Sequence, residues 1–264
     1  MEEILKVLSK RTDKLKKAYT DYQNNPYQPE TAHKVRTHSR KLRSLLNFLK
    51  KTFDEDEYDR LNDELKNLAR IYGRLREVDV LIELCTEIAL DEPGLSDDYK
   101  ALFAFLHKER LKEMRRTFNK TKVRSAESAL AAVEAGVGNI SLKEKPDWGR
   151  YIKKRLVKKN RRLTEAYHNA DMDDHEAVHE IRKKAKKLRF SAKYLGKFSS
   201  GKHKKMTRNA QRIQDEFGVL TDAHVNRQML ETYAERVDDE ALKKLFYKID
   251  EAQQKMLNNS QGGA

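Results

Sequence analysis

Apolar residues recur every three or four positions along most of the chain, which is the period of a helix with one face against a core. Runs of alternating β-branched residues, which are typical of strands, do not occur. The four prolines and several glycines fall in short polar stretches between the periodic segments, where helices are expected to end. The pattern therefore predicts an all-α fold with helices over residues 2–23, 29–51, 55–72, 75–91, 97–122, 149–169, 174–197, 203–217, 219–237 and 239–257.

One long segment lacks the regular helical pattern. Residues 125–147 are rich in alanine, glycine and serine and end in Lys-Glu-Lys-Pro-Asp, so we expect a linker there. With 264 residues, the chain is long enough for two domains. The expected organisation is a first helical bundle repeat at 1–124, the linker at 125–147 and a second helical bundle repeat at 148–264.

The second half repeats a motif of the first. Residues 33–43 read HKVRTHSRKLR and residues 179–189 read HEIRKKAKKLR, so both fit H-x-[VI]-R-x-x-x-[RK]-K-L-R. Residues 73–80, GRLREVDV, match residues 218–225, GVLTDAHV, at nearly the same offset. Because two motifs occur in the same order in both halves, we expect the halves to be structural repeats.

The repeated motif separates basic from apolar positions on a helix. At about 100° per residue, the basic positions of the first copy fall within an arc of roughly 80°, and Val35 and Leu42 lie nearly opposite. Like charges at this spacing destabilise an isolated helix, so their alignment in both copies suggests a ligand that neutralises them. Further basic residues cluster before the second motif of each half. The candidate binding residues are His33, Arg36, Arg40, Arg43, Arg70, Arg76, His179, Arg182, Lys186, Arg189, Lys193, Lys205, Arg208 and Arg212.

The overall charge favours the same interpretation. The chain has a formal net charge of +14 and a pI near 9.6, which points to an acidic partner. Residues 150–212 hold 21 Lys and Arg against 6 Asp and Glu, so this stretch alone carries more than the whole net charge.

Two other interpretations of the basic stripes remain open. Each stripe could be a solvated helix face, or it could form structural ion pairs with acidic residues such as Glu77, Asp79 or Asp222. Recurrence in both halves and the mixture of histidine with arginine favour ligand binding, since solubility requires neither.

These motifs resemble those of the CHAD family, the conserved histidine α-helical domains, and the resemblance covers nearly the whole chain of a stand-alone member. It implies two similar antiparallel four-helix bundles related by a pseudo-two-fold axis. It also implies a basic groove between them that binds inorganic polyphosphate without catalysis. His38 and Ser39 depart from the family pattern, which often has small or apolar residues there, and Thr221 replaces a common arginine or asparagine.

Polyphosphate suits such residues because it is a flexible polyanion without nucleobases, so a protein can bind it only through its phosphate oxygens. Arginine offers a two-pronged, permanently charged donor, and His33 and His179 can each donate an N–H. Polyphosphate granules are a further candidate partner. The alternative function is RNA binding by the same basic surface, although the stripes lack interleaved aromatic residues for base stacking.

Other chemistries receive less support from the sequence. The histidines lie among Arg and Lys without a cysteine or carboxylate set to complete a metal site. No phosphate-binding glycine loop or nucleophile motif indicates an enzyme, histidine phosphorylation is the remaining catalytic alternative, and no cofactor is expected. The single cysteine, Cys85, lies in an apolar run and is expected to be a buried thiol. Without a signal peptide or an apolar stretch long enough to span a membrane, we expect a cytoplasmic location and no membrane partner.

Overall fold

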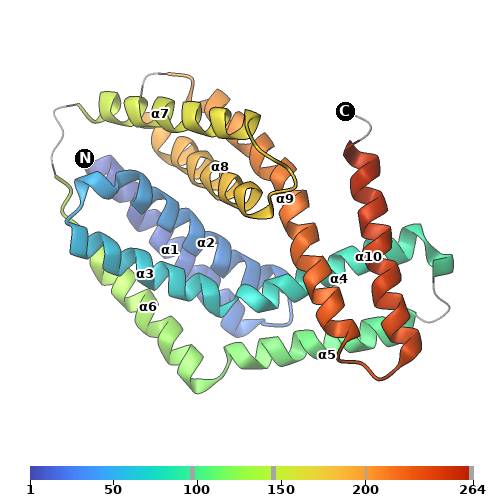
Figure 1. Cartoon of the computed structure of the whole chain (residues 1–264). Coiled ribbons are helices and arrows are strands. Elements are labelled where there is room, and N and C mark those ends of the chain that lie inside the picture. Colours follow the sequence, from blue (N-terminus) through green and yellow to red (C-terminus); the bar gives the residue numbers. More distant parts are fainter. Residues whose placement is uncertain (96–98, 144–146, 200, 262–264) are drawn as a thin grey trace. The chain divides into compact units, whose positions relative to one another are not determined.

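The computed structural model describes residues 1–95, 99–143, 147–199 and 201–261, and all regular elements within these ranges are helical. The prediction of an all-α fold is confirmed. Single 3-10 turns follow three of the α-helices, and Figure 1 shows the arrangement of the longer elements. The α-helices are α1 (Glu2–Asn24), α2 (Pro29–Leu49), α3 (Glu55–Ile71), α4 (Gly73–Asp91), α5 (Tyr99–Thr117), α6 (Lys120–Gly138), α7 (Trp148–His168), α8 (His175–Leu195), α9 (His203–Ala234) and α10 (Glu240–Gln261).

Two of the expected helix divisions are wrong. The helix expected over 97–122, whose residues 97 and 98 lie outside the described part, is two helices. These are α5 and α6. Asn119 caps the start of α6, because its side-chain oxygen accepts a hydrogen bond from the Thr121 backbone N–H at 2.9 Å. In contrast, α9 continues through Gly218, where two helices were expected. A glycine inside a helix costs only about 1 kcal/mol, which packing on both sides can offset.

Most of the segment expected to be a linker is the helix α6. Its buried residues include Ala126, Ala129, Leu130 and Val133, which recur every three or four positions. This face packs against α3 and α1. Residues 144–146 of the expected linker lie outside the described residues. The alanine-rich composition therefore marks a closely packed helix rather than a chain break.

Replacement of Gly136 by alanine tests this packing. A Cβ at Gly136 would collide with Leu61 Cδ2 and lie 3.2 Å from Leu61 Cγ, and Leu61 is fully buried. We expect Gly136→Ala to lower the free energy of unfolding by about 1–3 kcal/mol, because the core has no room for the methyl group. Gly138→Ala is the control, since nothing lies within 4 Å of its Cβ position. Equal unfolding midpoints of the two variants in denaturant would contradict the expected packing.

The first compact unit, unit 1, comprises residues 1–73 and 117–217. Its central helix is α2, which packs against α1, α3 and α8. The apolar stripe of α2 is fully buried at Ala32, Val35, Leu42 and Leu46. α8 also packs against α7, so α1, α3 and α7 adjoin the two helices that carry the repeated motifs, α2 and α8 (Figure 1).

The second compact unit, unit 2, comprises residues 74–116 and the chain from Gly218 onward. Its core joins α4, α5, the later part of α9 and α10, with Tyr233 and Phe246 among its buried aromatic residues. Cys85 is fully buried there, as expected, and burial raises the pKa of its thiol to about 12. Within this core, Arg110 Nε donates a hydrogen bond to Asp79 Oδ1 at 2.7 Å, and only 7% and 1% of the two side chains are exposed.

The compact units differ from the predicted division into residues 1–124 and 148–264. Each unit takes residues from both halves of the sequence, because the chain leaves unit 1 at the start of α4 and again within α9. The repeat is therefore a property of the sequence rather than the boundary of a compact unit. The finer arrangement, as two four-helix bundles about a pseudo-two-fold axis, stays a prediction.

Candidate functional site

The two copies of the repeated motif meet within unit 1. α2 carries the first copy and α8 the second, and these helices pack against each other along a contact that we call the α2–α8 seam. Small buried side chains allow the close approach: Ser191 Oγ lies 3.4 Å from the carbonyl oxygen of Ser44, and Ala192 is fully buried. The seam thus brings two basic helices together instead of separating them.

On one side of the seam, α2, α7 and α8 contribute to a group of cations that we call the α7-side cluster: Arg40, Arg43, Lys159, His179 and Lys187. Loss of hydration lowers the pKa of Lys187, and the charge of Arg43 lowers it further. The pKa of Lys159 is lowered by burial and by cations that include Lys187. Burial and nearby cations, among them Arg40, lower the pKa of His179. Positive charges from three helices therefore act on one another here.

A second group, the α1-side cluster, lies where α1, α2 and α8 meet, and it consists of Arg11, Lys14, His38, Lys41, Arg189 and Lys193. The pKa of Lys41 is lowered by burial and then by four of these cations, the largest effect coming from Lys193. Burial, followed by Lys41, Arg11, Lys14 and the nearby Lys34, lowers the pKa of His38 to about 4. The His38 Nδ1 atom is buried and has no hydrogen-bond partner among the described residues. This histidine is therefore neutral at physiological pH.

Reciprocal stacking contacts flank the two clusters. Arg11 of α1 lies over the Tyr194 ring of α8, 4.6 Å from its centroid, and Arg155 of α7 lies over the Phe48 ring of α2 at 5.3 Å. Phe48 and Tyr194 are equivalent positions, each five residues after the last arginine of its motif. Cation–π contacts of this kind hold a guanidinium in place without neutralising it. The two sides of the seam are thus built alike.

The sequence matches the CHAD domain family over residues 6–231. The chain belongs to this family. Two solved structures share its fold: PptA from Streptomyces chartreusis and the CHAD domain from the plant Ricinus communis. The first has a TM-score of 0.75 and 12% sequence identity, over 98% of this chain and 95% of that chain. The second has a TM-score of 0.69 and 17% identity, over 97% and 86%. No curated protein matches the sequence.

The CHAD domain places nine of the fourteen predicted site residues on α2 and α8. Those that belong to the two clusters are Arg40, Arg43, His179, Arg189 and Lys193. The remaining four residues of this set are His33, Arg36, Arg182 and Lys186.

Arg36, a member of the predicted stripe, has a structural contact with the main chain of α3. Arg36 Nη1 donates a hydrogen bond to the carbonyl oxygen of Ala69 at 3.1 Å, in the last turn of α3. Arg36 thus ties α2 to the end of α3, where a helix leaves carbonyl groups without internal partners. Its replacement would therefore affect folding.

The other five predicted residues have no described contact with the clusters. Arg70 lies near the end of α3, and Lys205, Arg208 and Arg212 are exposed on α9. Arg212 forms an ion pair with Glu216 at 3.2 Å, and Arg76 belongs to unit 2, where it pairs with Glu83 at 2.9 Å.

The fourteen candidate binding residues do not include six cations of this region: Arg11, Lys14, Lys41, Arg155, Lys159 and Lys187. Basic spacing on the first helix and on its later counterpart does indicate Lys14, Arg155 and Lys159. Lys41 and Lys187 are the invariant lysines of the repeated motif, so the repeat itself could have indicated them. They lie outside the arc of the stripe because basic residues flank the apolar seam on both sides. Which side chains of α1 and α7 approach the seam depends on tertiary packing, which the spacing of residues does not reveal.

Two of the three acidic residues proposed as structural partners, Glu77 and Asp79, are engaged elsewhere. Glu77 pairs with Arg74 at 3.4 Å and Asp79 pairs with Arg110, both within unit 2. Across the described residues, no group of three or more His, Cys, Asp or Glu side chains is placed to hold a metal ion. No helix in the described part is both long and apolar enough to cross a membrane.

Proposed function

We propose that this CHAD domain binds inorganic polyphosphate at the α2–α8 seam, without a catalytic step. The observation that carries the proposal is the pair of cation clusters that the packing of α1, α2, α7 and α8 brings together. Burial, and then neighbouring positive charges, lower the pKa of Lys41, Lys159 and Lys187 there. Packing like charges together costs free energy unless an anion neutralises them. A ligand with a charge on every phosphate can do so at several positions at once.

The clusters suit phosphate oxygens better than nucleic-acid bases. Binding of single-stranded nucleic acid uses open aromatic faces on which bases stack. Here Arg11 covers the Tyr194 ring and Arg155 lies over Phe48, which is buried. The aromatic residues nearest the cations therefore support arginines instead of offering faces to bases. This favours polyphosphate over RNA.

A competition experiment tests the proposal. Long-chain polyphosphate and a single-stranded RNA of equal total charge compete for the full chain at physiological salt, where weak electrostatic binding is largely screened. We expect polyphosphate to displace RNA at lower concentration, and to bind more tightly than pyrophosphate because a long chain reaches both clusters. Preferential retention of RNA would overturn the proposal.

Binding should also depend on pH. Burial, and then nearby cations, lower the pKa of His38 and His179 in the free domain, and a polyanion that neutralises these cations removes the second effect and so raises both pKa values. Binding therefore takes up protons, so affinity increases as the pH falls, by at most about tenfold per pH unit for each proton. Calorimetry in buffers of different protonation enthalpy measures the uptake.

Replacement of His38 and His179 by asparagine should remove most of this pH dependence while leaving binding at high pH nearly unchanged. Proton release on binding, or an identical pH dependence in the variant, would contradict the assignment to these two histidines.

A further inference from the structure

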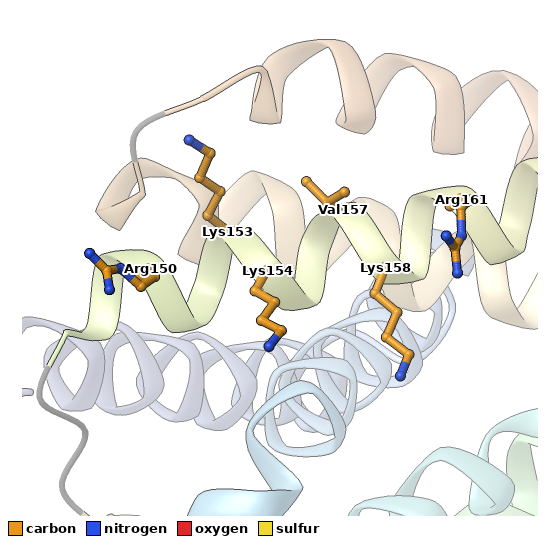
Figure 2. A pocket seen from close by; sticks show the side chains of 6 residues that line it. All are labelled: Arg150, Lys153, Lys154, Val157, Lys158 and Arg161. Carbon is orange, nitrogen blue, oxygen red and sulfur yellow. The ribbon is translucent and has the colours of Figure 1, made fainter.

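Helix α7 has a second basic surface that the seam does not use. Its residues Arg150, Lys153, Lys154, Lys158 and Arg161, together called the outer α7 face, line a shallow pocket with Val157 (Figure 2). All five cations are exposed, in contrast to the partly buried Arg155 and Lys159 on the same helix.

The outer α7 face contains a row of charges along the helix. Arg150, Lys154 and Lys158 are four residues apart, so they follow one side of α7 at intervals of about 6 Å, and Arg161 continues the row. Figure 2 shows Lys154 and Lys158 extending from one side of the helix, while Lys153 and Val157 extend from the other. A flexible anionic chain lying along α7 can contact the row at each turn.

Most of this charge has no acidic counterpart. Arg150 and Arg161 approach Asp147 and Glu165 at 3.6 and 3.4 Å, and both arginines are largely exposed. Among the described residues, Lys153, Lys154 and Lys158 form no salt bridge. Glu165 is the only acidic residue within α7. Acidic residues of α7 therefore do not neutralise the row, which can attract an anionic ligand.

The outer α7 face is continuous with the α7-side cluster. At about 100° per residue, basic positions of α7 recur at steps of no more than about 40° around half of the helix, from Arg150 through Lys158 to Lys159. Tyr151, Glu165 and Ala166 share this arc. Lys159 belongs to the α7-side cluster, where it is close enough to Lys187 for that charge to lower its pKa. An anionic chain that leaves the cluster therefore meets further cations as it passes over α7.

We infer that the outer α7 face extends the binding site to long polyphosphate chains, so that it distinguishes long chains from short ones. The inference rests on the proposed function. A short chain occupies the cations at the seam, whereas a longer one also contacts Lys154 and Lys158. The additional contacts form within an already bound molecule, which strengthens long-chain binding without a second bimolecular step.

The test compares Lys154→Gln/Lys158→Gln with Lys120→Gln/Lys122→Gln, which removes the same charge from exposed positions of α6. Each variant and the unaltered chain are titrated by calorimetry with tripolyphosphate and with a polyphosphate of many tens of phosphates. We expect the α7 variant to bind the long chain about tenfold more weakly and tripolyphosphate equally well. The α6 variant should resemble the unaltered chain with both ligands.

The outcomes separate the inference from the proposed function. If the unaltered chain binds neither ligand, the proposed function itself fails. If it binds both and the α7 variant is no weaker than the α6 variant, or is equally weakened for both ligands, the inference is overturned. Circular dichroism melting curves establish that the exposed substitutions leave the fold intact.

Discussion

Replacement of Arg43 and Lys187 by glutamine is expected to weaken binding of long-chain polyphosphate by about 10²–10⁴-fold. The two side chains come from opposite helices of the α2–α8 seam and lie close enough for Arg43 to lower the pKa of Lys187. Each charge-assisted hydrogen bond contributes about 1.5–3 kcal/mol, so the loss of two gives this range. Titration calorimetry at moderate salt measures the change.

The same variant should unfold at equal or higher denaturant concentration in the absence of ligand. Removal of two mutually repelling charges relieves a cost that polyphosphate otherwise offsets. Glutamine at position 43 keeps a polar end group near Asn62, the hydrogen-bond partner of Arg43. The charge-matched control is Lys120→Gln/Lys122→Gln, and an equal loss of affinity in the two variants would show that only the overall charge matters.

The largest expected effect on stability is in unit 2, where Asp79→Ala should lower the free energy of unfolding by about 3–5 kcal/mol. The substitution leaves the Arg110 guanidinium buried without its carboxylate, and an unpaired buried charge is strongly destabilising. Equilibrium denaturation followed by circular dichroism measures the difference. Burial raises the pKa of Asp79 while Arg110 opposes this shift, so the carboxylate depends on its partner to stay charged.

A second variant separates the buried charge from the space left by a smaller side chain. Asp79→Ala with Arg110→Met removes both charges and should recover much of the stability, because an apolar pair can replace a buried ion pair at little cost. An Asp79→Ala variant as stable as the unaltered chain would contradict the importance of this pair.

Helical periodicity predicted most of the fold because it is a local property. The apolar stripe of α2, at Val35, Leu42 and Leu46, is buried as its spacing predicted. Residues 125–138 were assigned wrongly to a linker because alanine and glycine are common both in linkers and in closely packed helices. Gly136 faces the core because it lies against Leu61 of α3, and a contact between residues so far apart in sequence cannot be seen from the local pattern.

The candidate site was predicted in part for a similar reason. The repeated motif indicated which helices carry the cations, and the seam between α2 and α8 brings the two copies together. The spacing could not show that basic residues flank both sides of the seam, nor that Arg11 and Arg155 approach it from α1 and α7. It also could not show that Arg76 pairs with Glu83 in unit 2.

The burial of Cys85 has a practical consequence. Thiolate is the form that alkylating reagents attack, so a buried thiol with a pKa of about 12 reacts only when unit 2 opens. The only tryptophan, Trp148, begins α7 in unit 1. The unaltered chain thus contains one intrinsic reporter for each unit. Pulsed alkylation and tryptophan fluorescence, followed along one denaturant series, distinguish two independently melting units from a single cooperative one.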